Sequence, residues 1–349
     1  MYVWVALGAW IASVLCVCVV RLIARRFNIV DKPGQPRKIH TKPIPLLGGV
    51  GVYAAFSLSI LVLFLLSSPQ GLHITDAHVS SSQIAAILIG GFFLIIGGAL
   101  DDIFNFKPWQ QIIWPLLAVL SVAIGGIGIS VLSNPFNGGL ISLGIWKDAL
   151  TAIWLLTAIY TTKFLDGLDG LVSGLTAIGA LVIALFSILL FVNMPTALLA
   201  CMVLGVFLGF LVFNFHPATI FLGEAGSTFA GYMLGVLAIL TGAKFAVALL
   251  IMGIPILDAA WVIFRRSVIE RRSPFIGDRY HLHFRLLDAG FSQRQAVCII
   301  YALAALFGAS ALFLQSTQKI AALGILLLCT IALGLYISKR KIRVLSEKV

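Results

Sequence analysis

The stretch QIAAILIGGFFLIIGGALDD, residues 83–102, sets the fold class of this chain. It holds no charged side chain before Asp101, and an apolar run of about 17 to 25 residues is long enough to cross the hydrocarbon core of a bilayer as a helix. A strand of a membrane barrel would alternate polar and apolar residues, which this stretch does not. Because lipid offers the backbone no hydrogen-bond partner, the run is predicted to be a transmembrane helix.

The rest of the 349-residue chain has the same character. Hydrophobic residues make up 60% of it and charged residues only 11%, whereas soluble globular proteins carry about 25% charged residues. A water-soluble protein is therefore excluded, and we expect an all-α, polytopic integral membrane helical bundle that forms a single domain over residues 1–349. About eleven spanning helices are predicted, over residues 2–22, 46–68, 83–100, 111–130, 148–162, 171–192, 196–214, 228–243, 245–264, 295–314 and 320–337.

The basic residues predict an orientation. The formal net charge is +11, from 24 Lys and Arg against 13 Asp and Glu. In so apolar a chain this excess is typical of cytoplasmic loops and implies no nucleic acid, because positively charged loops stay on the cytoplasmic side. With the N-terminus outside and the C-terminus inside, every basic residue except Lys147, Lys244 and Lys319 falls on the cytoplasmic side.

Two adjacent aspartates, Asp101 and Asp102, end the run quoted above. Carboxylates at the C-terminus of a helix are disfavoured by the negative end of the helix dipole. Their placement therefore favours a bound cation or a basic partner over the alternative, a plain solvated helix end.

Three further carboxylates are expected at the same membrane face. Asp166 and Asp169 lie three residues apart, each followed by glycine, in a turn that would aim both side chains at one point. Glu224 is the only acid in a long apolar neighbourhood, where an unpaired carboxylate would be costly to desolvate. Together with the aspartate pair these oxygen ligands suit a hard divalent ion, Mg²⁺ first and Mn²⁺ as a second candidate.

The longest polar segment, residues 264–294, is predicted to be a cytoplasmic substrate-binding loop. His281, His283 and Arg285 alternate within it, and imidazoles and guanidinium groups bind phosphate oxygens well. A zinc site is the alternative, but no third soft ligand lies nearby. Carboxylates, a metal and basic groups at one membrane face indicate phosphoryl chemistry.

A second basic loop precedes the span that opens with Gly48-Gly49. It holds Lys38, His40 and Lys42 among prolines, and a loop retained inside by its charge alone is the simpler interpretation. The glycine pair instead favours close approach of another backbone or a ligand. These three side chains, together with Lys163, are the candidate contacts to a phosphate.

These residues resemble the motifs of the polyprenyl-phosphate N-acetylhexosamine-1-phosphate transferases, the glycosyltransferase family 4 type of enzyme. Members begin the synthesis of teichoic acid, O-antigen (lipopolysaccharide) and related glycans of cell wall biogenesis, and the enzyme that makes lipid I is related. The motifs are, in chain order, Arg37–His40, Pro43–Gly49, Asp101–Asp102, Asp166–Gly170, Phe221–Gly223 and His281–His283.

The resemblance implies a reaction and a location. The enzyme would transfer a sugar 1-phosphate, first of all from UDP-N-acetylglucosamine (UDP-GlcNAc), to undecaprenyl phosphate and release UMP, either directly or through a covalent intermediate. It would lie in the bacterial inner membrane, in contact with lipid, with its site on the cytoplasmic face; a homodimer is usual in the superfamily.

The resemblance also implies roles for the residues. Asp101 would orient or deprotonate the lipid phosphate, Asp101, Asp102 and Glu224 would hold the metal, and Phe221 would stack on uracil. The remaining positions line the nucleotide and sugar pocket: Asp166, Asp169, His281, His283 and Arg285.

The chain departs from the family pattern at five positions, Gln111, Lys163, Thr219, Glu224 and Phe284. Lys163 stands where an asparagine is usual, and the hypotheses are a relocated phosphate contact or a competitor of the metal for Asp166. The rival functions are an impaired family member that binds lipid or nucleotide sugar, and a transporter. Transporters place ionisable groups near the bilayer midplane, where this chain has only Asp258.

Overall fold

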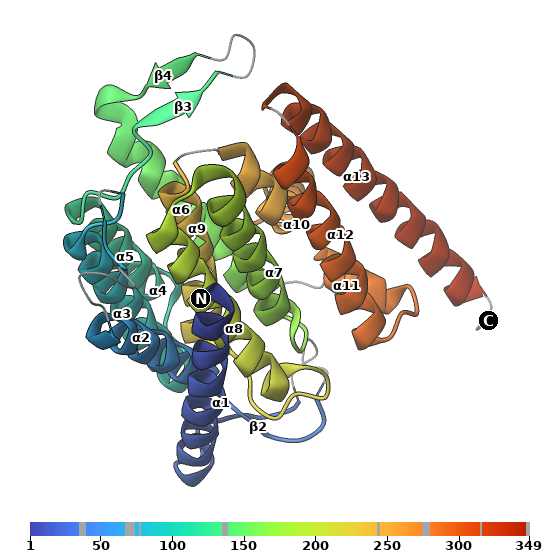
Figure 1. Ribbon diagram of the computed structural model, residues 1–349. Helices are drawn as coiled ribbons and strands as arrows, with labels where there is room; N and C mark the ends of the chain where they lie inside the picture. Colours follow the sequence, from blue (N-terminus) through green and yellow to red (C-terminus); the bar gives the residue numbers. More distant parts are fainter. Residues whose placement is uncertain are drawn as a thin grey trace.

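The computed structural model describes residues 1–34, 40–66, 74–76, 78–134, 139–242, 245–273, 280–314 and 316–346. It is mostly helical (Figure 1), which confirms the expected helical membrane bundle. The helices are α1 (Tyr2–Arg26), α2 (Gly48–Leu66), α3 (Ser81–Phe104), α4 (Pro108–Gln111), α5 (Ile113–Ile124), α6 (Lys147–Leu165), α7 (Leu171–Phe186), α8 (Met194–Asn214), α9 (Gly223–Leu240), α10 (Phe245–Phe264), α11 (Leu282–Asp288), α12 (Gln293–Phe313) and α13 (Ser316–Ser346).

Three short turns of 3₁₀ or π-helix and two small sheets complete the secondary structure of the described chain. The turns are η1 (Gly144–Trp146), η2 (Ser187–Phe191) and η3 (Arg265–Ile269), and the last of them extends α10. Strands β1 (Val30–Asp31) and β2 (Ile44–Pro45) pair antiparallel, as do β3 (Val131–Ser133) and β4 (Leu140–Ser142).

Each of the eleven predicted runs coincides with a helix. Eight of the described helices are long and apolar enough to cross a membrane, and α4 and α5 form a shorter apolar segment, Pro108–Ile124. Helices α6 and α10 are not among the eight, although they are 19 and 20 residues long. The number of spans and the orientation of the termini stay predictions.

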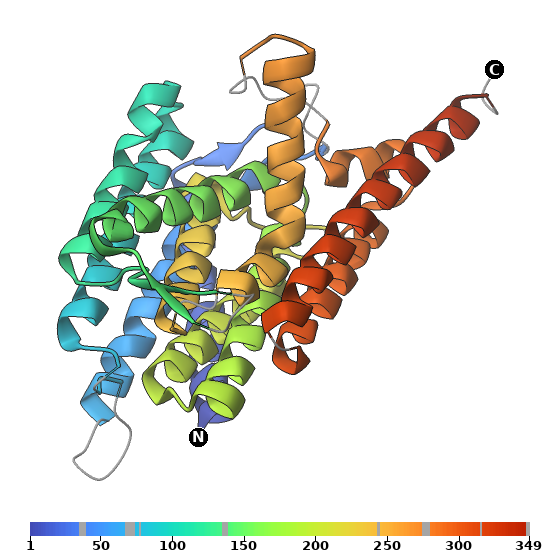
Figure 2. The same ribbon diagram turned by 90° about the horizontal axis from the view of Figure 1, so that it is seen from above.

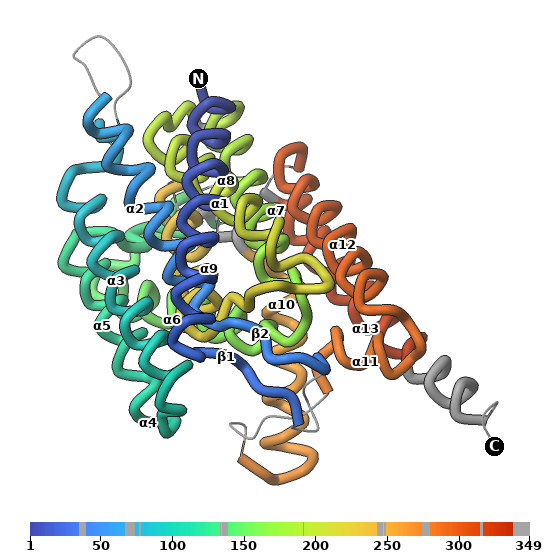
Figure 3. The backbone as a smooth tube through the Cα atoms, turned by 90° about the horizontal axis from the view of Figure 1, so that it is seen from below, coloured from blue at the N-terminus to red at the C-terminus, as the bar shows by residue number. Residues whose placement is uncertain are grey.

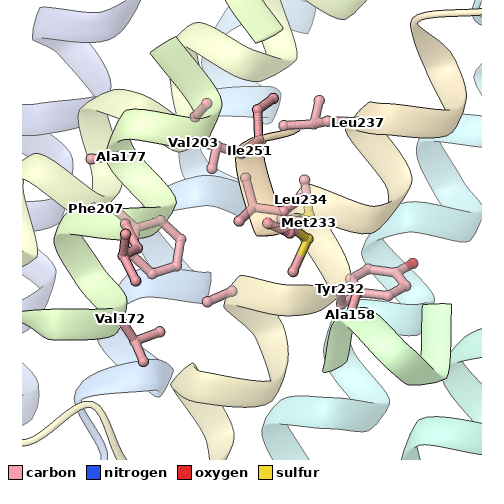
Figure 4. Packing of buried hydrophobic residues seen from close by; sticks show 14 of the residues in the cluster. Ala158, Val172, Ala177, Val203, Phe207, Tyr232, Met233, Leu234, Leu237 and Ile251 are labelled. Carbon is pink, nitrogen blue, oxygen red and sulfur yellow. The ribbon is translucent and has the colours of Figure 1, made fainter. Parts of the chain in front are cut away.

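Helix α9 forms the centre of the bundle. Figures 1 and 2 place α3–α5 on one side, α11–α13 on the other and α6–α10 between them. Most of the α9 side chains are buried, and Figure 4 shows Tyr232, Met233, Leu234 and Leu237 of this helix packed among apolar side chains of α6, α7, α8 and α10. Because neighbouring helices surround α9, the first turn of α9 and its side chains have a fixed position.

Glycines let α2 and α3 approach the start of α9 closely. A Cβ on Gly98 of α3 would clash with the backbone of Ala225, and one on Gly49 of α2 would clash with the backbone of Gly226. Small residues allow such backbone contact between membrane helices. The ends of α3 and α9 that carry acidic residues are therefore held side by side.

The β1–β2 hairpin, α4 and α11 lie at one end of the bundle, opposite the N-terminus, as Figure 3 shows. Pairing continues from the hairpin into the core, because the Phe221 N–H donates to the Pro45 carbonyl at 2.9 Å and the Gly48 N–H donates to the Phe221 carbonyl at 3.0 Å. This end of the molecule holds the cavity described next.

Candidate active site

A cavity of about 1990 Å³ is lined by the ends of α3 and α6, the start of α9, part of α10 and the loops between them. Ten of the side chains singled out from the sequence line it: His40, Lys42, Asp101, Asp102, Lys163, Asp166, Asp169, Phe221, Glu224 and His281. The motifs separated along the chain are thus brought into one site.

Asp101 is 7% exposed and lies in the last turn of α3. Its Oδ1 accepts hydrogen bonds from the Phe106 N–H at 2.7 Å and from Gln111 Nε2 at 3.2 Å. These donors offset the unfavourable helix dipole that made the aspartate pair conspicuous in the sequence. They also fix one edge of the carboxylate toward α4.

Asp102 points instead to the start of α9, where the helix dipole favours negative charge. Its Oδ1 accepts a hydrogen bond from the Glu224 N–H at 3.0 Å. Gly223, at a φ of +73°, lets the carboxylate sit against the backbone, since a Cβ there would clash with Asp102 Oδ2. That Oδ2 is buried and has no hydrogen-bond partner in the described residues, which leaves one oxygen free for a ligand.

Lys163, in the last turn of α6, bridges two other elements. Its Nζ lies 3.0 Å from Glu224 Oε2 and donates to Gln111 Oε1 at 2.8 Å. One sequence hypothesis was that Lys163 competes with the metal for Asp166. Within the described chain Lys163 forms its ion pair with Glu224, so Asp166 is the wrong carboxylate for that hypothesis.

The two aspartates of the loop between α6 and α7 have different surroundings. Asp169 Oδ2 accepts from the Ala218 N–H at 3.0 Å and lies 2.7 Å from His216 Nδ1. Asp166 is open to the cavity. The protein around the cavity desolvates its carboxylate, and this effect, with the nearby charges of Glu224 and Asp169, raises the pKa of Asp166 to about 8. Of these two loop aspartates, Asp169 is held by His216 and Ala218, and Asp166 is the one that faces a ligand in the cavity.

Asn214 holds this loop in place, a role that the sequence reasoning missed. Its Oδ1 accepts from the Gly170 N–H at 3.1 Å and from Ser173 Oγ at 2.8 Å, while its Nδ2 donates to the Ile220 carbonyl at 3.1 Å. The available signal was an amide at the end of a long apolar helix, which needs partners when buried.

His281 is positioned by Asp258, the one acid that the sequence placed inside a span. His281 Nδ1 lies 2.8 Å from Asp258 Oδ2, and the Leu282 N–H donates to Asp258 Oδ1 at 2.8 Å. Both side chains are buried, at 7% and 6% exposure. The sequence analysis did not assign Asp258 to the site, although an ionisable group in a membrane segment is a candidate functional residue and could have pointed to it.

The structure does not bring His283 and Arg285 to the cavity lining. His283 is fully buried, and its ring packs so closely on Gly167 that a Cβ there would clash with Nε2. Arg285 Nη2 donates to the Gly334 carbonyl of α13 at 2.7 Å. The reason is that residues 282–288 form helix α11, in which alternate residues point to different sides; contact of these two residues with substrate stays a prediction.

Three of the candidate phosphate contacts, Lys38, His40 and Lys42, fall between β1 and β2 in the sequence. The His40 ring makes an edge contact with Phe221 at 5.3 Å between centroids, and its Nε2 lies 3.5 Å from Asp31 Oδ2. Lys42 is exposed on the cavity lining. Lys38 lies outside the described residues. Of these three, the structure brings His40 and Lys42 to the site.

Arg266 is a further basic residue of the cavity. It is only 4% exposed and lines the cavity from η3, whereas the sequence presented it as one member of a basic run. A guanidinium group there suits an anionic ligand.

Within the part of the chain that the structure describes, no group of three Asp, Glu, His or Cys side chains is close enough to hold a metal ion. The expected set of Asp101, Asp102 and Glu224 is thus not assembled as a complete ligand shell. Mg²⁺ usually takes one or two protein carboxylates, waters and substrate phosphates, so the free oxygen of Asp102 and the carboxylate of Glu224 fit such a site.

A helical membrane bundle with carboxylates and basic groups around one cavity defines a class of membrane enzyme, and comparison with known proteins agrees. The sequence model of "Glycosyl transferase family 4" matches residues 84–242. The chain belongs to this family, that of the polyprenyl-phosphate N-acetylhexosamine-1-phosphate transferases.

Similar proteins cover most of the chain. It is 32% identical over 345 residues to the decaprenyl-phosphate N-acetylglucosaminephosphotransferase of Mycolicibacterium smegmatis, covering 90% of this chain and 83% of that protein. It is 30% identical to the probable undecaprenyl-phosphate N-acetylglucosaminyl 1-phosphate transferase of Bacillus subtilis, with coverages of 88% and 84%. The undecaprenyl-phosphate alpha-N-acetylglucosaminyl 1-phosphate transferase of Escherichia coli K12 is 28% identical, with coverages of 90% and 84%.

Proposed function

We propose that this protein transfers an N-acetylhexosamine 1-phosphate, with N-acetylglucosamine as the first candidate sugar, from a UDP-sugar to undecaprenyl phosphate and releases UMP. The names of these relatives, which include a polyprenyl phosphate and N-acetylglucosamine, support the acceptor and the sugar. The reaction takes place at the cytoplasmic face of a bacterial inner membrane and begins the assembly of an envelope glycan.

The observation that carries the proposal is a cavity in which a cluster of charges adjoins an apolar wall. Leu156 of α6 and Ile256, Ala259 and Ile263 of α10 line the cavity together with the carboxylates and Lys163. A polyprenyl phosphate has this same division, with a long apolar chain and one charged end. The apolar wall suits the chain and the charged end suits the reacting phosphates.

The polar residues have separate tasks in the reaction. An oxygen of the lipid phosphate attacks the phosphorus attached to the sugar, and the bond between that phosphorus and the UMP oxygen breaks. Asp101, held by Phe106 and Gln111, orients the lipid phosphate or takes its proton. Arg266 and His281 balance phosphate charge or bind the sugar, and Phe221 offers a ring to the base.

Mg²⁺, or Mn²⁺ in its place, is the proposed cofactor. Asp102 and Glu224 would hold it, and when bound it neutralises charge on the diphosphate. The buried, unpartnered Oδ2 of Asp102 supports this assignment, because such an oxygen is costly without a ligand.

The test is release of UMP by the purified protein in detergent. UDP-GlcNAc, undecaprenyl phosphate and Mg²⁺ are supplied, and UMP is measured with wild-type protein and with Asp101→Asn as the control. We expect turnover by the wild type and its loss in the variant. A panel of UDP-N-acetylhexosamines identifies the sugar; absence of UMP with every member, while UDP-sugar still binds, would instead indicate a binding protein.

A further inference from the structure

Three of the five positions that depart from the family pattern touch one another in the structure. Lys163 donates to Gln111 Oε1 at 2.8 Å and pairs with Glu224 Oε2 at 3.0 Å. The three residues come from α4, α6 and α9, so their contact is a product of the fold and not of nearness in sequence.

The contacts continue to the aspartate pair on both sides. Gln111 Nε2 donates to Asp101 Oδ1 at 3.2 Å, and the Glu224 N–H donates to Asp102 Oδ1 at 3.0 Å. Because Asp101 and Asp102 are adjacent in α3, the hydrogen bonds, the ion pair and the α3 backbone form a closed circuit through five residues. Lys163 contributes the single positive charge of that circuit.

Each partner of Lys163 is suited to it. The Gln111 amide accepts from Lys163 with its oxygen and donates to Asp101 and the Phe106 carbonyl with its nitrogen, so both of its polar atoms are used. The family pattern often has lysine at position 111 and aspartate at position 224. A lysine at position 111 would place a second ammonium group beside the first. An aspartate at position 224 would be shorter by one carbon–carbon bond, about 1.5 Å, and would draw back from Lys163.

We propose that Lys163 is an internal counter-ion of the carboxylate cluster, which holds Glu224 in place without metal and competes with a divalent cation for that carboxylate. Lys163 is thus a positioning residue that sets the metal affinity of the site. This inference rests on the proposed function, because that function supplies the reason for a divalent cation. A cation that takes Glu224 Oε2 as its ligand must displace the ammonium group from that oxygen, and a cation that takes the other oxygen binds a carboxylate whose charge Lys163 already balances.

The test is binding of Mn²⁺ to the purified protein without substrates, followed by electron paramagnetic resonance. Lys163→Met removes the charge and keeps an unbranched side chain that is one atom shorter. We expect Mn²⁺ to bind about fivefold more tightly to it than to the wild type, the factor that corresponds to loss of a partly buried ion pair. The matched control is Lys107→Met, because Lys107 is exposed outside the cavity lining, and its Mn²⁺ affinity should equal that of the wild type.

A second variant keeps the test decisive if Lys163→Met folds poorly. Gln111→Lys should weaken Mn²⁺ binding. The loss of Mn²⁺ affinity caused by Gln111→Lys should be smaller when Lys163→Asn is also present, since the two ammonium groups would no longer face each other. Equal or weaker Mn²⁺ binding by Lys163→Met, no Mn²⁺ binding by any form, or strictly additive effects of the Gln111 and Lys163 changes would each overturn the counter-ion role.

The UMP assay separates this inference from the proposed function. A wild type that releases UMP, together with unchanged Mn²⁺ affinity in Lys163→Met, refutes the counter-ion role alone. A wild type that releases no UMP, together with tighter Mn²⁺ binding by the variant, refutes the transferase function and leaves the counter-ion role standing.

Discussion

The carboxylate of Asp258 in α10 holds the imidazole of His281, with Oδ2 at 2.8 Å from Nδ1. The pair joins two parts of the chain that are 23 residues apart and is buried on both sides. A carboxylate at Nδ1 fixes the neutral ring in the tautomer with the proton on Nδ1, so that Nε2 is an acceptor. Asp258 therefore determines that His281 offers a ligand a hydrogen-bond acceptor at Nε2.

Asp258→Asn should slow UMP release by about tenfold to hundredfold, the range expected for loss of one hydrogen bond to a charged group. The asparagine still accepts from the Leu282 N–H, but its amide nitrogen faces Nδ1 and favours the other tautomer. The rate is compared among Asp258→Asn, His281→Asn and the double variant. We expect the double variant to be no slower than His281→Asn alone. A wild-type rate for Asp258→Asn would show that the pair has only a structural role.

Gly167→Ala should lower the free energy of unfolding by about 1–3 kcal/mol, because the new Cβ would overlap the buried His283 ring. His283→Ala removes that ring, so the double variant should be more stable than the sum of the single effects predicts. Thermal unfolding of the four forms in detergent measures this coupling. Additive effects would mean that the loop moves away from His283 at little cost.

Gly223→Ala should impair both stability and turnover. The left-handed φ of +73° costs a side-chain-bearing residue about 1–2 kcal/mol, and the Cβ would displace Asp102 from the start of α9. Gly324→Ala in α13 is the matched control, because a Cβ there meets nothing within 4 Å and should be neutral or slightly stabilising. Thermal unfolding and UMP release are compared for both variants; equal activity of the two would contradict the assigned place of Asp102.

The metal-free protein should lose stability as the pH rises toward 8. The pKa of Asp166 is raised from its usual 3.8 to about 8, so between these values the folded form keeps a proton that the unfolded form has released. Stability then falls with increasing pH in this range. Asp166→Asn removes this contribution, so its melting temperature in chelator should exceed that of the wild type by a margin that grows from pH 6 to pH 8. A constant margin would show that Asp166 ionises normally.

The helices themselves could be predicted well, because a bilayer imposes its requirement on each segment separately. An apolar run such as residues 83–100 must be helical whatever surrounds it, and every predicted run overlaps a helix. The run at 111–130 was less well delimited: the structure has α4 ending at Gln111 and α5 ending at Ile124. Its apolar character continues beyond α5, and hydropathy does not record where a helix stops.

The site could be predicted in part. The scarce carboxylates on one face, Asp101, Asp102, Asp166, Asp169 and Glu224, do gather around one cavity. Their individual partners could not be foreseen, since Lys163 meets Glu224 across 61 positions of sequence and Asp169 turns to His216. The alternating pattern of His281, His283 and Arg285 predicted one shared site, but of these three only His281 lines the cavity. Alternate residues of helix α11 point to different sides.

Hydropathy and charge are properties of a residue and its close neighbours, so the chain alone was enough for the membrane setting, the helices and the family. The direction of a side chain depends on how each helix is rotated and how closely it packs, and that is set by contacts among many helices at once. The glycines of α2 and α3 pack against α9 and so place Asp102 beside Gly223. Helix α10 places Asp258 within hydrogen-bond distance of His281. Which carboxylate is paired, which is free and which side chains reach the cavity therefore followed from packing in three dimensions.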